Sequence, residues 1–333
     1  MAQPSASEAF HRIVTRHSSQ GNASSGLVNV TFFVGAGFSK TWDTTSPTGN
    51  ELFTFPKEFL AGMAEDIVID EIKAVVQKRF ETISRLNDLD EASGRFPAPP
   101  EPTPNQTKIL DFFQWMSSHQ AMKEGAARGV HAQFLSTNYD YVVETILDNV
   151  GEKNALRNTY RGITPARING RRNRNVVQDH WSINSLIKIN GGFEIVPSGD
   201  AFDFDYRRRS FDAIREAAPE IMMPSKEQNY ANLYFSSIFP KAVRLLQESD
   251  VLVIVGYSLS EEDALLRFLI RQFAEDLRDV HGKSIFYVDY TDANVLEERL
   301  QGCFRSKNRM DVNNVFTFSG GFVEWIDQIL RRT

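Results

Sequence analysis

The sequence predicts an α/β protein in which a mainly parallel sheet is covered by helices on both faces. Short apolar, β-branched runs alternate with longer segments whose apolar residues recur at helical spacing. The clearest run, residues 251–255, reads VLVIV, as a strand buried on both faces does. Several runs end in Gly, Ser, Asn or Asp. Because right-handed crossovers bring the carboxyl ends of parallel strands to one edge, these polar residues are expected to share one crevice.

Length and composition are those of a soluble globular protein. The 333 residues are 41% hydrophobic and 24% charged, and the net charge of -6 argues against general polyanion binding. No apolar run reaches the roughly 18 residues of a membrane span, and the N-terminus lacks a signal-peptide pattern, so we expect a cytoplasmic protein. The single cysteine, Cys303, excludes an intrachain disulfide and a cysteine-based zinc site.

Residues 1–26 read as a short helix and a small-polar linker, before a domain that spans 27–333. In its first strand, residues 28–34, an apolar run leads into Gly35-Ala36-Gly37. Two glycines with only a methyl group between them let backbone N–H groups approach a pyrophosphate. The same pattern occurs at ordinary strand–loop junctions, so these residues alone indicate either a nucleotide-binding turn or a plain one.

Residues 54–128 are predicted to form a mainly helical insertion. Apolar residues recur at near-helical spacing over 60–83 and again over 107–128. Between these two patterns, residues 91–106 contain five prolines and read as an exposed connector. A lid or an oligomer contact is one use of such an insertion, and core packing is the commoner one.

The later strands each lead into polar residues. We expect strands at 131–137, 185–189, 251–255, 283–288 and 315–318, with a less clear one at 220–223. Helices are expected at 141–149, 230–247, 292–300 and 322–331, and from residue 261. Asn138 and Asp140 follow the strand at 131–137, where they either meet a ligand or cap the next helix.

Arginine is concentrated in two places. Six arginines lie between 157 and 174, and three more at 207–209. A nucleic-acid surface and a subunit contact are both compatible with this pattern, although few aromatic residues are interleaved.

Five segments together resemble the sirtuin-like NAD-binding family, whose fold is Rossmann-like. They are GAGFS (35–39), STNYD (136–140), IKING (187–191), VGYSLSEED (255–263) and the late strand ending in Asp289. The closer resemblance is to the NAD hydrolases of prokaryotic anti-phage defence. It covers roughly 27–53 and 131–300, and it depends on the order and spacing of the segments.

The resemblance implies roles for particular residues. Those expected to line the pyrophosphate and ribose are Gly35, Ala36, Gly37, Phe38 and Ser39. Gly256 and Ser258 would hold the phosphates, and Asp289 would lie near the adenosine ribose. Asn138 and Asp140 would face the nicotinamide ribose, where cleavage passes through an oxocarbenium-like state that needs charge stabilisation and a held hydroxyl or water.

Two departures from the family pattern bear on activity. Deacetylating sirtuins hold a structural zinc with four cysteines, which a chain with one cysteine does not supply. The family also usually carries a histidine where this chain has Asn190, and a general base is typically worth about 10²–10⁴-fold in rate. The chain is therefore weak or inactive by nature, uses another base such as His180, or carries an inactivating substitution.

The resemblance implies an NAD+ hydrolase that releases nicotinamide and ADP-ribose and depletes NAD during abortive infection. NAD is its substrate, and no metal and no membrane are expected. A homo-oligomer is expected, together with a separate sensor or activator such as a ring-forming ATPase or an Argonaute-type protein. Nucleic acid would then act only indirectly. The alternatives are a non-catalytic NAD or ADP-ribose sensor and a nucleic-acid-associated subunit.

Overall fold

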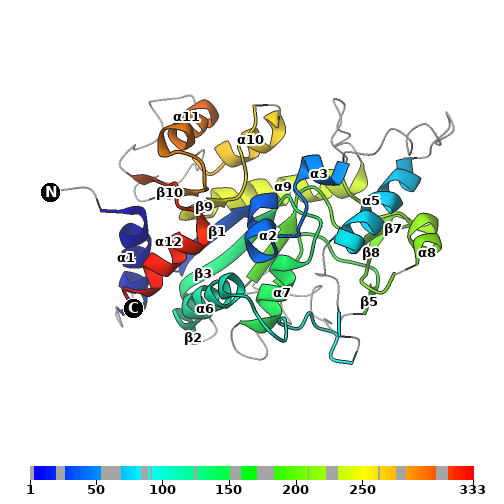
Figure 1. Ribbon diagram of the computed structural model, residues 1–333, viewed down its shortest axis with the longest axis horizontal. Coiled ribbons are helices and arrows are strands. Elements are labelled where there is room, and N and C mark those ends of the chain that lie inside the picture. Colours follow the sequence, from blue (N-terminus) through cyan, green and yellow to red (C-terminus); the bar gives the residue numbers. More distant parts are fainter. Residues whose placement is uncertain are drawn as a thin grey trace.

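An eight-stranded sheet forms the centre of the computed structural model (Figure 1). The structure describes residues 4–19, 27–53, 69–83, 89–90, 92–123, 126–150, 159–170, 184–208, 210–222, 232–261, 263–274, 283–304 and 314–333. The strands of this sheet are β1 (Leu27–Val34), β2 (Gln120–Lys123), β3 (Ala126–Ser136), β4 (Thr159–Tyr160), β6 (Asn184–Lys188), β9 (Val251–Val255), β10 (Ser284–Val288) and β11 (Val315–Phe318).

The strand order is β11-β10-β9-β1-β3-β6-β4, and every pairing along this path is parallel. β2 lies off the path and pairs antiparallel with β3. The predicted α/β, Rossmann-like and mainly parallel sheet is therefore confirmed.

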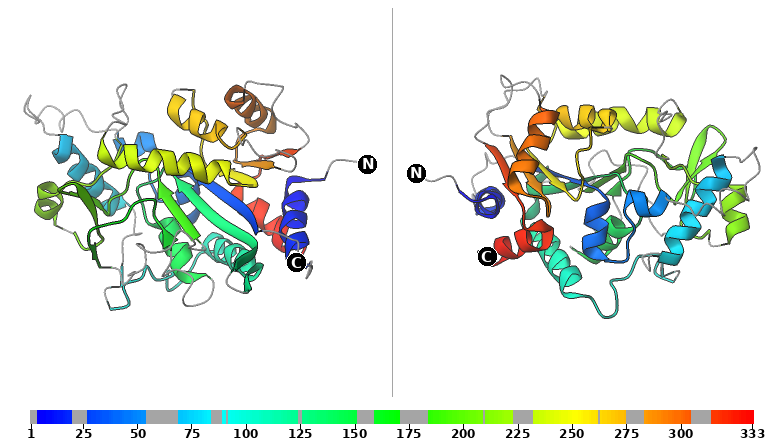
Figure 2. Two further views of the ribbon diagram at one scale, coloured as in Figure 1. Left: turned by 180° about the vertical axis from the view of Figure 1, so that it is seen from behind. Right: turned by 45° about the horizontal axis from the view of Figure 1, so that its top comes forward.

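Helices cover both faces of the sheet (Figure 2). On one face lie α1 (Ala6–Ser19), α2 (Ala36–Trp42), α6 (Pro104–Ser118), α7 (Val142–Asn149) and α12 (Gly321–Leu330). On the other lie α9 (Leu233–Gln247), α10 (Ala264–Arg271) and α11 (Ala293–Cys303). Because side chains alternate along a strand, Phe32 and Val34 enter the first core while Phe33 enters the second. β9, which is buried at every position, is apolar throughout.

A smaller unit lies at the end of the molecule opposite α1 and α12 (Figure 1). It contains a three-stranded sheet of β5 (Ile168–Asn169), β8 (Ala201–Asp205) and β7 (Ile195–Ser198). The other helices of the described ranges are α3 (Gly49–Phe53), α5 (Ile69–Ile83) and α8 (Phe211–Glu216), of which α5 contacts α8. None of these three short strands was predicted.

Some predicted boundaries are wrong, for local reasons. α6 begins inside the proline-rich connector, because Thr103 and Gln106 form a capping box and Pro104 occupies the first helical position. Residues 107–128 are not all helical, since the chain leaves α6 after Ser118 and forms β2 and the start of β3. The carbonyl of His119 there accepts the N–H of Val130 at 3.2 Å.

Other predictions fall partly outside the described residues. The limits of the insertion at 54–128 stay a prediction, because residues 54–68 and 84–88 are not described. Of the strand expected at 220–223, the structure has a single bridge between Gly191 and Ile221. Within the described ranges, no helix is both long enough and apolar enough to cross a membrane.

Candidate functional site

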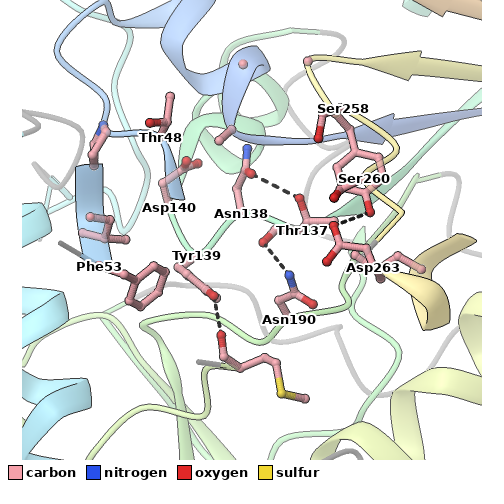
Figure 3. A pocket seen from close by; sticks show the side chains of 18 of the residues that line it. Thr48, Phe53, Thr137, Asn138, Tyr139, Asp140, Asn190, Ser258, Ser260 and Asp263 are labelled. Atoms are coloured by element: carbon pink, nitrogen blue, oxygen red, sulfur yellow. Dashed lines mark hydrogen bonds between the residues drawn. The ribbon is translucent and has the colours of Figure 1, made fainter. Parts of the chain in front are cut away.

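A pocket of about 820 Å³ opens at the carboxyl edge of the main sheet (Figure 3). Its volume falls in the range of roughly 300–1,000 Å³ that is usual for small-molecule sites. Its lining comes from the segments that follow β3, β6, β9 and β10, from the start of α2 after β1, and from α3, α5, α10 and α11. The lining residues are Ala36, Gly37, Pro47, Thr48, Leu52, Phe53, Phe80, Thr137, Asn138, Tyr139, Asp140, Asn190, Met222, Gly256, Tyr257, Ser258, Ser260, Asp263, Leu266, Asp289, Thr291 and Arg299.

One wall consists of two glycine turns in backbone contact. The N–H of Gly35 donates to the carbonyl of Val255, and that of Gly37 to the carbonyl of Gly256, both at 3.0 Å. Gly256 has a φ of 60°, and a Cβ atom there would lie 2.2 Å from the backbone nitrogen of Phe38. A side chain at Gly256 is therefore excluded by both conformation and space. These glycines bring the ends of β1 and β9 together.

Ser39 connects Asn138 to Asp140. The amide Nδ2 of Asn138 donates to the carbonyl of Gly35 and to Oγ of Ser39, both at 2.8 Å. Oγ of Ser39 in turn donates to Oδ2 of Asp140 at 2.5 Å. Because both hydrogens of Nδ2 are used, Oδ1 is the atom of the Asn138 amide that remains for a ligand. It lies 3.5 Å from the Thr137 hydroxyl.

Asp140 is buried, and its two oxygens have different partners. Oδ1 accepts the N–H of Val142, at the start of α7, at 3.0 Å, while Oδ2 accepts from Ser39. Asp140 therefore accepts a backbone N–H at the start of α7 and also lines the pocket, so both roles expected from the sequence are present. Burial raises the pKa of Asp140, and this effect outweighs the two hydrogen bonds and the nearby Lys188 charge, which favour the ionised form.

A buried group of charges lies behind Asp140. Nζ of Lys188 donates to the backbone carbonyl of Asp140 at 2.6 Å and pairs with Glu144 at 2.8 Å and Glu194 at 3.1 Å. Arg161 also pairs with Glu194 and lies 3.5 Å from Glu144. Burial alone would raise the pKa of Glu194, but Lys188 and Arg161 together hold it below its ordinary value. This group fixes the backbone of the STNYD segment from behind.

The burial of Arg161 corrects one expectation for the arginine-rich stretch. Arg161 is 6% exposed, so it belongs to the interior and not to a contact surface. Arg167, the other arginine of 157–174 within the described residues, forms an ion pair with Asp203 at 2.6 Å. The rest of that cluster lies outside the described residues.

Asn190 extends from the end of β6 toward the pocket. Its Nδ2 donates to the carbonyl of Thr137 at 3.3 Å. Its Oδ1 is buried and accepts no hydrogen bond from any described residue. None of the described residues that line the pocket is a histidine, and His180 lies outside the described part of the chain.

The opposite end of the pocket lies at β10. Oδ1 of Asp289 accepts the N–H of Thr291 at 3.1 Å and its hydroxyl at 2.9 Å. Nη1 of Arg299 lies 3.5 Å from the same hydroxyl. Ser258 is exposed at the end of β9, between this region and the glycine wall.

A family model described as the SIR2-like domain matches residues 132–309, which is more than half of the chain. The chain belongs to the SIR2-like family. The match includes Asn138, Asp140, Asn190, Gly256, Ser258 and Asp289, and it begins after the GAGFS segment.

Three solved structures similar to this SIR2-like chain are sirtuin structures. A Sir2 homologue–NAD complex is 13% identical, with a TM-score of 0.47 over 100% of this chain and 96% of that one. A mutant Sir2 homologue with ADP-ribose is also 13% identical, with a TM-score of 0.45 over 98% and 95% of the two chains. A Sir2 enzyme studied for mechanism and regulation is 12% identical, with a TM-score of 0.41 over 98% of each chain. Among curated proteins, none matches the chain.

The SIR2-like chain brings most of the predicted site residues to one pocket. Those that line it are Ala36, Gly37, Asn138, Asp140, Asn190, Gly256, Ser258 and Asp289. Gly35 and Ser39 lie behind the wall and hold Asn138. Phe38 does not line the pocket, because it points into the core, where its ring centroid is 5.4 Å from that of Phe322.

Several lining residues were not predicted. Thr137 and Tyr139 belong to the STNYD segment, and Asp263 ends VGYSLSEED, so their segments already carried the signal. Thr291 and Arg299 follow Asp289 and carry no signal of their own. Among the residues that the structure describes, no three His, Cys, Asp or Glu side chains gather as metal ligands.

Proposed function

We propose that this SIR2-like chain binds NAD+ and that its chemistry is hydrolysis of the nicotinamide–ribose bond, giving nicotinamide and ADP-ribose. The observation that carries the proposal is the Asn138–Ser39–Asp140 chain of hydrogen bonds beside the glycine wall. It presents an amide oxygen and a carboxylate to a pocket whose adjacent wall is bare backbone at Gly37 and Gly256.

The dimensions of the pocket fit an extended dinucleotide. Asp289 follows β10 and Asn138 follows β3, and the order β10-β9-β1-β3 separates these strands by three positions. At about 4.8 Å per strand, the separation is roughly 14 Å, which two riboses joined by a pyrophosphate can span. In this arrangement, the phosphates lie against Ala36, Gly37 and Gly256 with the hydroxyl of Ser258, and the adenosine ribose lies at Asp289.

The nicotinamide ribose then lies at Asn138 and Asp140. As the glycosidic bond breaks, positive charge develops at the anomeric carbon, and nicotinamide leaves with the bonding electron pair. A carboxylate fixed beside that carbon stabilises the charge without reorganising. Oδ1 of Asn138 accepts a hydrogen bond from a ribose hydroxyl or from water, because the donors of the same amide are held by Gly35 and Ser39.

We further propose that the hydrolysis serves anti-phage defence by depleting NAD in the infected cell. This step, and the expected self-assembly with a ring-forming ATPase or an Argonaute-type partner, depend on the sequence resemblance. The described arginines of 157–174 give the nucleic-acid alternative no support, since Arg161 is buried and Arg167 is paired with Asp203. The alternative of a non-catalytic sensor is favoured by Asn190, because an amide does not accept a proton at neutral pH.

The experiment is nicotinamide release from NAD+ by the wild-type chain and by Asn190→His, each with and without its genomic neighbour. NAD+ binding by calorimetry runs in parallel. Release by either form, in step with ADP-ribose, supports the hydrolase. Binding of NAD+ by both forms without any release supports the sensor and overturns the hydrolase. Absence of NAD+ binding in both forms overturns both functions.

A further inference from the structure

We propose that Asp263 is the general base of the hydrolysis in this chain and that Asn190 orients the attacking water. The proposal deepens the proposed function and rests on it. It accounts for a pocket whose described lining residues include no histidine, and in which Asn190 stands where the resemblance leads one to expect a histidine.

Oδ1 of Asn190 is the first observation. It is buried within the pocket lining and accepts no hydrogen bond from the described residues, while Nδ2 is fixed on the carbonyl of Thr137. A buried acceptor without a donor is uncommon and requires an explanation. A water bound there donates one of its hydrogens to this oxygen, which leaves its other hydrogen for a base.

Among the described residues, three carboxylates line the pocket, and two of them are already engaged or distant. Each oxygen of Asp140 accepts a hydrogen bond, from Val142 and from Ser39. Asp289 holds Thr291 at the end of β10, four strand positions from β6, which Asn190 follows, or roughly 19 Å. Neither is available to take a proton from a water at Asn190.

Asp263 is the third carboxylate, and its geometry is unusual. It occupies the N-cap position of α10, where an aspartate ordinarily accepts a backbone N–H, yet its side chain makes no capping hydrogen bond. Oδ2 instead accepts the hydroxyl of Tyr257 at 2.8 Å. No other described residue donates to this carboxylate, so Oδ1 stays available. Tyr257 therefore turns the carboxylate away from the helix that it could cap.

The surroundings of Asp263 suit proton transfer. The residue is half-buried and lines the pocket, so it reaches both a bound substrate and solvent. In the view of Figure 3, Asp263 projects into the pocket from the side of α10, and Asn190 from the end of β6. The N-terminus of α10 and the segment after β6 thus supply the two acceptors that one water needs.

The chemical step balances without a further reactant. The water oxygen forms a bond to the anomeric carbon, and the bond from that carbon to the nicotinamide nitrogen breaks with its electron pair on nicotinamide. Asp263 takes the proton of the water and passes it to solvent. The products are nicotinamide, ADP-ribose and one proton.

The test compares Asp263→Asn and Asp263→Ala with the wild-type chain, using NAD+ turnover and NAD+ affinity. Both variants are expected to lose about 10²–10⁴-fold in kcat, the usual contribution of a general base, with NAD+ affinity within a few-fold of wild type. Sodium formate supplies a small carboxylate and is expected to restore part of the turnover of Asp263→Ala. Sodium chloride at equal ionic strength is expected to restore none. Asp111→Asn, an exposed carboxylate on α6, is the matched control and is expected to keep wild-type turnover.

The outcomes separate this proposal from the proposed function. Equal kcat for Asp263→Asn and wild type overturns the role of Asp263 and leaves the hydrolase standing. If the wild-type chain shows no turnover while Asn190→His is active, the role of Asp263 is likewise overturned and the hydrolase stands. Binding of NAD+ without turnover by both of those forms overturns the hydrolase, and the role of Asp263 with it.

Discussion

Oγ of Ser39 donates a 2.5 Å hydrogen bond to Oδ2 of Asp140, although 101 positions separate the two residues. The same oxygen accepts from Asn138. One buried hydroxyl therefore sets the orientation of both residues proposed to face the nicotinamide ribose. The site depends on how β1 and β3 lie side by side as much as on the residues that face the ligand.

Ser39→Ala is expected to lower both turnover and stability. It removes the donor to a buried carboxylate, which costs about 1–3 kcal/mol, and it frees the Asn138 amide to rotate. We expect a loss of at least about tenfold in kcat, measured by nicotinamide release beside urea unfolding. Ser46→Ala is the control, because Ser46 is equally buried and its hydroxyl has no hydrogen-bond partner within the described residues. Equal effects of the two substitutions on both readouts would contradict the role given to Ser39.

Gly256→Ala is expected to disrupt the glycine wall. Its Cβ would meet the backbone of Phe38 and Gly37 at 2.2 and 2.5 Å. Gly199 has a nearly identical φ of 62°, but a Cβ there meets nothing within 4 Å. Gly199→Ala should therefore show only the cost of the left-handed backbone, about 1–2 kcal/mol. Gly256→Ala should be clearly less stable than Gly199→Ala and should lose NAD+ binding. Thermal unfolding measures the stability and calorimetry the binding, and equal results for the two variants would contradict this prediction.

Lys188→Met is expected to destabilise the fold strongly. Lys188 is 1% exposed, and its loss leaves two buried glutamates short of a counter-charge, which costs about 3–5 kcal/mol. Lys108 pairs with Asp327 at a similar distance, 3.0 Å, but at the surface. Lys108→Met should cost about 0–1 kcal/mol. Urea unfolding measures the free energy of unfolding of the two variants. Similar decreases in both would show that the buried group of charges is not what holds the STNYD segment.

His131 is expected to make the fold less stable in mild acid. Burial lowers its pKa to about 4, from 6.5 when the chain is unfolded. The free energy of unfolding is therefore unaffected by His131 above pH 6.5 and decreases as the pH falls from 6.5 toward 4. The reason is that the unfolded chain binds the proton more tightly than the folded one. The full effect is about 3 kcal/mol. The difference in unfolding free energy between wild type and His131→Gln should change with pH over that window, and a constant difference would rule the effect out.

The sequence was most informative about strands rich in apolar residues. β1, β3, β6, β9, β10 and β11 were all predicted, and the clearest of them, β9, is buried at every position and is a continuous apolar run. β2, β4, β5, β7 and β8 have two to five residues each and carry no comparable pattern. α2 was missed because Gly35-Ala36-Gly37 reads as a turn, whereas a helix begins at Ala36 as soon as β1 ends.

The site was predictable in part for a related reason. Polar residues at strand ends converge because parallel strands end at one edge, so Asn138, Asn190, Gly256 and Asp289 could be placed together. The hydrogen bonds of Ser39 and the direction of the Asp263 side chain depend on tertiary packing, which no spacing reveals. Phe38 illustrates the converse error, because its segment borders the pocket while α2 turns its ring into the core.

The most direct test of NAD+ hydrolysis in this pocket is a paired measurement on the wild-type chain and Asn138→Ala. NAD+ is added to each, and nicotinamide, ADP-ribose and remaining NAD+ are followed together by proton NMR, with affinity measured on the same preparations. We predict equal release of nicotinamide and ADP-ribose by the wild type, and a loss of release in Asn138→Ala with NAD+ binding retained. Unchanged release in Asn138→Ala would contradict the account, and so would NAD+ left intact by both the wild-type chain and Asn190→His although both bind it.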